Sequence, residues 1–216
     1  MVGALQYLTM IRLDTYAIHV LSQFMHTPHI LLTCTLSSVF LQGTLGWDLQ
    51  LRPASTPIVI VAYSSTDWVR CKDSCRSTTS YALFFGPNLI AWHSKKRHKV
   101  CKSSTEVEHR AIGYTVAETI WIRKLLHDIG IFIFISPTRV YCDNISASYK
   151  AVNPIQHDRS KLAAVDYHFV RDSVAHEDLI VRYIPTKLQL ANIFIKGLSP
   201  KSVSYTHLTL PTKRIV

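Results

Sequence analysis

The sequence predicts an α/β domain in which helices pack against a mixed β-sheet. Three observations predict this class: an apolar, β-branched run at 57–64, a hairpin pattern at 81–94, and a long helical pattern from about Ser104 to Asp128. Shorter strand and helix patterns then follow to about residue 198. The resulting order, β-β-β-α-β-α-α-β-α, is typical of helices packed on a mixed sheet.

The pattern before residue 57 is weaker. Residues 1 to about 26 have apolar residues at helical spacing, whereas 27–43 are apolar without a period. LRPASTP (51–57) contains two prolines and is typical of a linker. The apolar run at 29–41 is shorter than the about 20 residues of a membrane span. Arg12 and Asp14 follow the first apolar run too closely for a signal peptide, so we expect an intracellular protein, cytoplasmic or nuclear.

Runs of β-branched and aromatic residues indicate the strands. PIVIVAYS (57–64) is apolar on both faces, as expected for a strand that is covered on both sides. YALFFG (81–86) and LIAWHS (89–94) are separated by Pro87 and Asn88, which favours a hairpin. TRVYCD (138–143) and LIVRYIP (179–185) predict two further short strands.

Apolar residues at three- and four-residue steps indicate the helices. In the helix predicted at Ser104–Asp128 they are Val107, Ala111, Ile112, Val116, Ile120 and Leu125. NISASYKAV (144–152) and LAAVDYHFVRDSVAHE (162–177) predict two more helices. LQLANIFIKGL (188–198) predicts a last helix, with Gly197 as its C-terminal cap.

The chain is basic. It has 24 Lys+Arg against 14 Asp+Glu and a formal net charge of +10, which favours nucleic acid as a partner over an anionic membrane. An ordinary basic globular protein would have the same balance. The cysteines fit no disulfide or zinc spacing, even together with His98, so we expect free thiols in a reducing compartment. These cysteines are Cys34, Cys71, Cys75, Cys101 and Cys142.

Acidic residues occur at strand ends and at a helix start. Asp67 and Asp143 end two predicted strands, and Glu106 and Glu108 begin the long helix. Such positions can converge on one face of a mixed sheet, and clustered carboxylates are the ligands that Mg²⁺ prefers. Two such ions about 3.5–4 Å apart activate water and stabilise the leaving oxygen in phosphodiester cleavage.

Helix geometry separates the two glutamates. At about 100° per residue, positions 106 and 108 point roughly 200° apart. Glu108 shares its side of the helix with Ala111 and Ile112, so it is predicted to face the sheet. Glu106 lies with Arg110 and is expected to be a solvated acid that interacts favourably with the helix dipole.

Several motifs occur together in one order. They are AYSSTDW, RSTTSY, LIAWHSKK, KSSTEVEHRA, VYCDN, NPIQHDRSK, DYHFVRD and IPTKLQLANIFIKGL. From about residue 2 to 200 the chain resembles the end of a copia-type LTR-retrotransposon Pol polyprotein, except at 28–41. The resemblance implies a reverse-transcriptase remnant at 1–52, an RNase H-like domain with a five-stranded mixed sheet at 53–200, and an unstructured or foreign tail at 201–216.

The same resemblance implies a metal site of four acids, of which this chain has two. The second and third acids fall on Glu108 and Asp143, which are therefore the candidate catalytic and metal-binding residues. The first and fourth fall on Ser65 and Asn192, where the family has aspartate. Leu162 also stands where the family tends to have histidine.

Asp67 is the candidate substitute for the acid that is missing at Ser65. Both side chains point to the same face of an extended strand, but Asp67 lies about 7 Å further along it. Metal coordination tolerates only tenths of an ångström, so we do not expect Asp67 to compensate. Mg²⁺ binding is expected to be weak or absent. The activity that the resemblance implies, degradation of RNA in RNA–DNA hybrids, is expected to be impaired or lost.

Plainer interpretations apply to each residue alone. Glu108 would fit a surface acid, and Asp143-Asn144 would fit a helix N-cap. The basic run at 94–102 would fit a solvated hairpin exit, but its place between sheet and acidic helix suits phosphate contacts. The residues predicted to make them are Lys95, Lys96, Arg97, Lys99 and Lys102. Trp68, Trp92 and Trp121 are expected to pack in the core rather than stack on bases.

Three classes of function follow from the sequence. They are an RNase H-like nuclease, a non-catalytic basic remnant that binds nucleic acid, and a non-functional pseudogene fragment. The expected partners are an RNA–DNA hybrid or another nucleic acid and the rest of a reverse transcriptase, with no membrane. Cleavage that depends on Mg²⁺ and binding that depends on salt would separate the three classes.

Overall fold

The computed structural model describes part of the chain. The described residues are 47–49, 51–53, 58–68, 76–97, 100–101, 103–131, 136–153, 164–196 and 212–214. The predicted helix at 1–26 and most of the segments 1–52 and 201–216 therefore lie outside the described residues. So do Cys34, Cys71, Cys75, His98, Lys99, Lys102, Leu162 and Gly197. Within the tail that was expected to be unstructured, β7 (Thr212–Arg214) pairs antiparallel with β1 (Trp47–Leu49).

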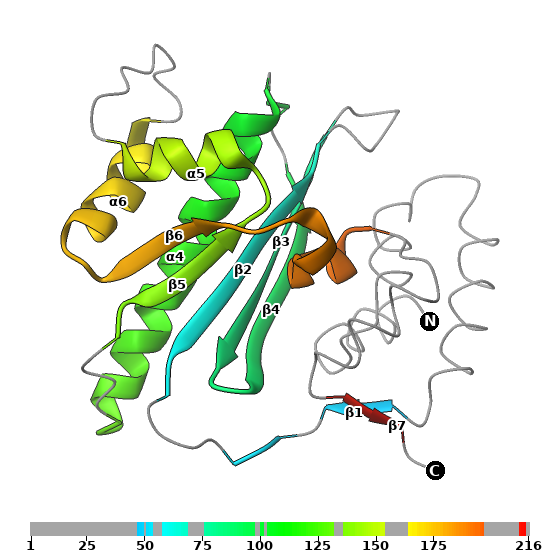
Figure 1. The fold of residues 1–216 in the computed structure, drawn as a ribbon, viewed down its shortest axis with the longest axis vertical. Coiled ribbons are helices and arrows are strands. Elements are labelled where there is room, and N and C mark those ends of the chain that lie inside the picture. Colours follow the sequence, from blue (N-terminus) through cyan, green and yellow to red (C-terminus); the bar gives the residue numbers. More distant parts are fainter. Residues whose placement is uncertain are drawn as a thin grey trace.

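A mixed sheet of five strands forms the centre of the fold (Figure 1), and its order is β4-β3-β2-β5-β6. The strands are β2 (Ile60–Asp67), β3 (Thr78–Phe85), β4 (Asn88–Lys96), β5 (Thr138–Cys142) and β6 (Leu179–Tyr183). β2, β3 and β4 are antiparallel neighbours, whereas β5 is parallel to β2 and β6 is parallel to β5. The predicted fold class is therefore confirmed.

Among the described residues, three α-helices accompany the sheet: α4 (Ser104–Asp128), α5 (Ile145–Val152) and α6 (Ala164–Ala175). The hairpin between β3 and β4 turns at Gly86-Pro87, one residue earlier than predicted. Gly86 has a φ of 58° there, a conformation that glycine adopts without a steric penalty. No helix in the described part of the chain is long and apolar enough to cross a membrane.

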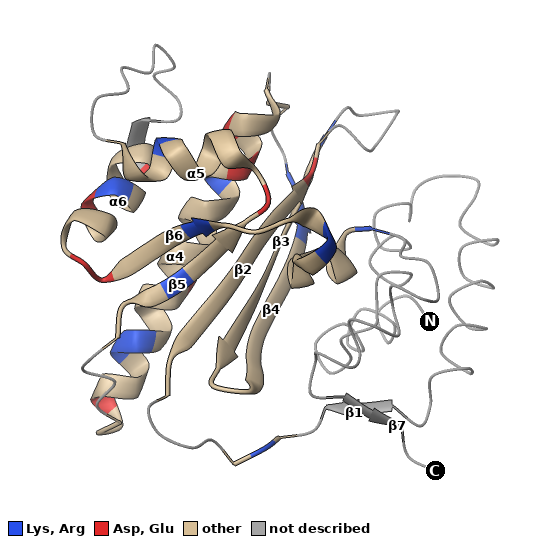
Figure 2. Ribbon diagram, viewed as in Figure 1, with Lys and Arg blue, Asp and Glu red and all other residues tan. Residues whose placement is uncertain are grey.

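The two faces of the sheet bury separate apolar clusters. The larger cluster joins β2, β3, β5 and β6 to the three α-helices, and Ile112 of α4 and Leu83 of β3 are fully buried in it. The smaller cluster lies on the other face, where Ala82 and Phe84 meet Ile193 and Phe194. Successive residues of β3 enter opposite clusters because side chains alternate along a strand. Figure 2 fits this arrangement: β3 has no charged residue, and β2 has one only at its end.

The buried side of α4 is partly polar. Thr115 and Thr119 are buried, and each hydroxyl donates to the backbone carbonyl one turn earlier, at 2.9 and 2.7 Å. These hydrogen bonds allow hydroxyl groups to face the sheet without an unpaired polar group. The predicted apolar stripe is accordingly wrong at its end, because Ile120 and Leu125 are 36% and 44% exposed.

The prediction of a last helix near the end of the domain is also wrong. Within its described part, residues 188–196 do not form an α-helix; two 3₁₀ turns, η1 (Thr186–Leu188) and η2 (Leu190–Phe194), occupy this region. Gln189 separates them in an extended conformation and is buried. Its Nε2 donates to the Ser64 carbonyl of β2 at 2.8 Å. A side chain that hydrogen-bonds the sheet in this way outweighs the helical apolar spacing.

Asn144 is the N-cap of α5, and its Oδ1 accepts from the Ala147 amide at 2.9 Å. We expect Asn144→Ala to lower the free energy of unfolding by about 1 kcal/mol, because an orphan amide of the first turn loses its acceptor. Urea denaturation measures this loss. Ser146→Ala is the matched control, since Ser146 is exposed in the same turn. An equal loss in both variants would contradict the capping role.

Candidate active site

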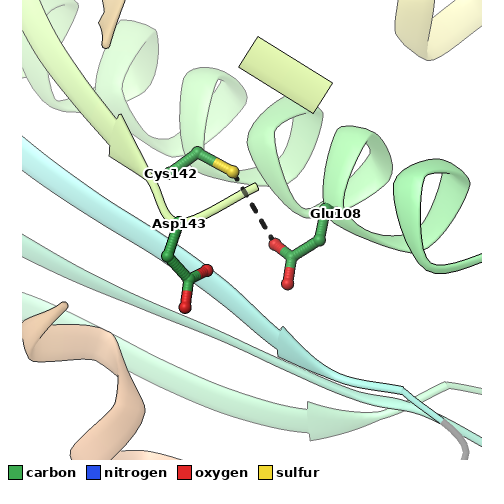
Figure 3. Close-up of side chains that lie close together, drawn as sticks. All are labelled: Glu108, Cys142 and Asp143. Atoms are coloured by element: carbon green, nitrogen blue, oxygen red, sulfur yellow. Dashed lines mark hydrogen bonds between the residues drawn. The ribbon is translucent and has the colours of Figure 1, made fainter. Parts of the chain in front are cut away.

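Glu108, Cys142 and Asp143 form one compact group (Figure 3). One possible ligand atom from each lies within 4.8 Å of the other two. Glu108 comes from the first turns of α4, Cys142 ends β5, and Asp143 follows it directly. β5 lies parallel to and beside β2, so the end of β5 and the start of α4 meet near the end of the central strand. The two acids predicted from the sequence are thus neighbours in space.

The Glu108 carboxylate is buried, with an exposed fraction of 7%. Its Oε1 accepts from the Thr66 amide of β2 at 3.0 Å, and the Cys142 thiol donates to its Oε2 at 3.8 Å. Burial and, after it, the nearby Asp143 carboxylate together raise the pKa of Glu108 to about 8. The prediction that Glu108 faces the sheet is confirmed.

Glu106 lies elsewhere on the helix, as predicted. Its Oε1 is 2.8 Å from Nη2 of Arg110, four residues later, and both side chains are partly exposed. Its place in the first turn also suits the positive end of the helix dipole. Glu106 therefore stabilises the helix and does not join the buried group.

The two positions that lack an acid contact each other. Ser65 Oγ donates to Asn192 Oδ1 at 2.8 Å, and both residues are buried, with exposed fractions of 0% and 4%. Asn192 Nδ2 also donates to the Thr186 carbonyl at 3.2 Å. Ser65 lies in the central strand β2 and Asn192 in η2. The two neutral side chains therefore hold η2 against the sheet and satisfy each other.

Lys196 brings a positive charge to the group. Its Nζ lies 3.9 Å from Asp143 Oδ2, whose side chain is only 8% exposed. Lys196 was not predicted from the sequence as a residue of this site. A weak signal existed, because Lys196 follows Asn192 by four residues, but the turn that carries it is not the α-helix that this spacing suggested.

Asp67, the candidate substitute that was not expected to compensate, lies outside the acidic group, and Cys142 lies inside it. Asp67 is the last residue of β2, and it is not a member of the Glu108–Cys142–Asp143 group found among the described residues. Cys142 is a member, which the sequence analysis did not predict. Burial raises the pKa of its thiol, and the Glu108 carboxylate raises it further. A protonated thiol is a hydrogen-bond donor and a poor match for the hard ion Mg²⁺.

These side chains do not fit a pair of Mg²⁺ ions. Mg²⁺ needs hard oxygen ligands in near-octahedral geometry, and a two-ion centre needs enough negative charge to balance both ions. The group offers two carboxylates, and Lys196 lies beside one of them. Ser65 and Asn192 present a hydroxyl and an amide, and these are already hydrogen-bonded to each other.

Of the basic residues predicted to contact phosphate, Lys95, Lys96 and Arg97 are among the described residues. Lys95 and Lys96 are the last two residues of strand β4, and Arg97 follows them. Arg97 Nε donates to Thr79 Oγ1 at 2.8 Å, and its guanidinium lies 3.7 Å from the centre of the Tyr114 ring. Arg97 is thus held in place by β3 and α4, whereas Lys95 is exposed.

The expectation that the tryptophans pack in the core holds for only one of them. Trp92 is partly buried and packs on the smaller apolar cluster. The expectation is wrong for Trp68 and Trp121, which are 47% and 58% exposed. Trp68 Nε1 donates to the Cys101 carbonyl at 3.3 Å, so its polar end is held at the surface. The apolar surroundings of Trp121 in the sequence suggested a core position, but its side of α4 is exposed.

No protein-family model matches the chain. It is 41% identical over 201 residues to the retrovirus-related Pol polyprotein from transposon RE1 of Arabidopsis thaliana, which covers 92% of this chain and 14% of the polyprotein. The Pol polyprotein from transposon TNT 1-94 of Nicotiana tabacum is 34% identical over 157 residues, or 73% of this chain and 12% of the polyprotein. The chain therefore spans only 14% and 12% of the length of these two relatives.

Solved structures with a similar fold include RNase H enzymes. LC11-RNase H1, isolated from compost, is 12% identical with a TM-score of 0.47, covering 67% of this chain and 98% of that one. The N-terminal RNase H domain of a Mycobacterium tuberculosis protein is 8% identical with a TM-score of 0.44, covering 70% of this chain and 98% of that one.

Proposed function

We propose that this chain, which is related over 92% of its length to the Pol polyproteins of copia-type retrotransposons, is an RNase H-like domain whose hydrolytic centre is disabled. The ancestral activity is degradation of the RNA strand of RNA–DNA hybrids during reverse transcription. In this chain we expect that activity to be absent or severely reduced. The observation that carries the proposal is the hydrogen bond between Ser65 and Asn192.

The Ser65–Asn192 contact supports the loss of the ion pair in two ways. Neither side chain has a negative charge, so neither helps to balance a divalent ion or to remove its bound waters. Each also uses an oxygen in the hydrogen bond, which an ion would have to break. Glu108 and Asp143 are then the metal-binding residues that remain, and we expect them to bind Mg²⁺ weakly at best.

The position of Lys196 supports the same proposal. An ammonium group near Asp143 offsets part of the negative charge that would attract a cation. Two buried carboxylates close together repel each other, and a nearby lysine reduces this cost without any bound ion. The remaining acids of the group can therefore stay folded in place after the loss of the other two.

Titration of Mg²⁺ or Mn²⁺ into the full chain tests this proposal. We expect no saturable heat of binding at low millimolar concentrations, and no rise in the midpoint of thermal unfolding beyond that caused by the same ionic strength of NaCl. A ligand that binds only the folded state raises its stability, so a tightly bound ion would be visible in the unfolding experiment. Saturable binding together with cleavage of an RNA–DNA hybrid would overturn the proposal.

A second candidate function is non-catalytic binding of nucleic acid. The formal net charge of +10 and the exposed Lys95 favour it, because phosphate contacts do not require the metal centre. An RNA–DNA hybrid is the expected ligand, and the remaining part of a Pol polyprotein is the expected protein partner. Binding of the hybrid that weakens steeply with added salt would separate this function from that of an inert fragment.

A further inference from the structure

A groove of about 810 Å³ lies between α4 and the strands β3 and β4. Glu108, Asp143, Ser65 and Asn192 do not line it, so it is separate from the acidic group within the described part of the chain. The lining residues on α4 extend from Val107 to Trp121. At 1.5 Å per residue this corresponds to a length of roughly 21 Å along the helix. It is therefore an elongated site beside the helix.

The described lining of the groove is basic. Four basic side chains line it, Lys95, Lys96, Arg97 and Arg110, against two acidic ones, Glu118 and Asp166. Arg110 is paired with Glu106, and Arg97 is stacked on Tyr114. Lys95 is exposed at the end of β4, and its charge is the one best placed to meet a ligand that enters from solvent.

The groove also presents aromatic rings. Tyr114 and Trp121 are 51% and 58% exposed, and they lie seven residues apart on α4, two turns along the same side of the helix. The Arg97 guanidinium covers part of Tyr114 at 3.7 Å from the ring centre. On the floor, Tyr81 stacks on His93 with 5.6 Å between ring centres.

Glu118 is held on the floor of the groove. The Tyr81 hydroxyl hydrogen-bonds to the Glu118 carboxylate, and the pKa of Tyr81 is raised to about 12 by burial and then by Glu118. This carboxylate repels phosphate, so it sets a limit on how tightly a polyanion can bind. Its removal is therefore an informative change.

We propose that this groove binds a single-stranded stretch of nucleic acid, with its phosphates near Lys95 and a base stacked on Trp121. This inference rests on nucleic acid being the ligand of the domain, as proposed above. Basic grooves with exposed aromatic rings are the usual means of binding single strands without sequence preference. A duplex cannot use Trp121 in this way, because its bases are already stacked on each other.

The test is fluorescence anisotropy of a short labelled oligo(U) with the full chain in EDTA, over a series of salt concentrations. We expect Trp121→Ala to weaken binding by at least about fivefold with an unchanged salt slope, since stacking is not electrostatic. Lys95→Gln should reduce the slope of log K against log salt by about 0.7, the value for one phosphate contact on a single strand. Lys124→Gln, an exposed change on α4 outside the groove, should leave binding unchanged.

A third variant is expected to change oligo(U) affinity in the opposite direction. Glu118→Gln should tighten oligo(U) binding severalfold, because it removes a negative charge from the groove and keeps the shape of the side chain. Thermal unfolding of each variant shows whether it remains folded. A folded Trp121→Ala variant that binds as well as the unmodified chain would overturn the proposal, and so would an unmodified chain that does not bind oligo(U).

These measurements distinguish this inference from the proposed function. Oligo(U) binding that is insensitive to both Trp121→Ala and Lys95→Gln would contradict the groove proposal and leave the disabled RNase H-like domain intact. Metal-dependent cleavage by the unmodified chain would contradict the proposal that the hydrolytic centre is disabled. It would not affect the groove proposal, because oligo(U) binding is measured in a chelator.

Discussion

Cleavage of an RNA–DNA hybrid is expected to rise by at least about 100-fold when Ser65→Asp and Asn192→Asp are introduced together. Bound metal ions contribute several kcal/mol to such reactions, and each 1.4 kcal/mol is a factor of ten in rate. Ser65 and Asn192 contact each other at 2.8 Å, so two aspartates there would face one another beside Glu108 and Asp143. The measurement is the initial cleavage rate of a labelled hybrid with Mg²⁺ and with EDTA.

The double variant should also become dependent on the metal for its stability. Four neighbouring carboxylates repel each other without an ion, so we expect a lower midpoint of thermal unfolding in EDTA than in the unmodified chain. Mg²⁺ should recover that loss, because an ion that binds only the folded state stabilises it. The unmodified chain, with two acids and Lys196 at the site, should respond little to either condition.

Ser65→Asn is the matched control for this experiment. With the natural Asn192 it places two amides where the double variant has two carboxylates, so side-chain size is the same and only charge differs. This control should show no Mg²⁺-dependent cleavage. Equal cleavage by the control and the double variant, or by the unmodified chain, would contradict the view that the missing charges disabled the site.

Ile112→Ala is expected to lower the free energy of unfolding by about 2–5 kcal/mol. Ile112 is fully buried in the larger apolar cluster, between α4 and the sheet, and truncation there removes apolar contacts and leaves a cavity. Because a domain has only about 5–15 kcal/mol of net stability, this loss would unfold a substantial fraction of the molecules at moderate temperature. Urea denaturation, followed by circular dichroism, measures the loss.

Ile120→Ala on the same helix is the matched control. The chemical change and the gain in helix propensity are identical, but Ile120 is 36% exposed. We expect a loss of no more than about 1 kcal/mol, since part of the side chain already contacts water. Similar losses at both positions would show that α4 is rotated relative to the sheet, which would also move Glu108 from its buried position.

The strands and the long helix could be predicted because they depend on local spacing. The alternation of β3 places Leu83 and Phe84 on opposite faces, and the period of α4 turns Glu108 toward the sheet while Glu106 pairs with Arg110. Such patterns can be recognised from residues that are close together in the sequence. The neutral residues at positions 65 and 192, where the resemblance implies aspartate, were also visible, because they are a matter of residue type.

Contacts between distant segments could not be read in this way. The last segment has helical spacing, yet the buried hydrogen bond from Gln189 to β2 leaves it as two 3₁₀ turns. Trp121 belongs to an apolar pattern, yet the sheet does not extend over its side of α4. In both cases the outcome depends on which surface lies opposite, and that surface comes from another part of the chain.

The sequence by itself determined the fold class, the buried side of α4 at Glu108 and the absence of acids at positions 65 and 192. Only the tertiary structure decided that Ser65 and Asn192, which are 127 positions apart, bond to each other and that Lys196 lies beside Asp143. The physical reason is the distance along the chain over which each effect acts. Periodicity follows from backbone geometry within a few residues, whereas the partner of a buried polar group is chosen by the packing of the whole domain.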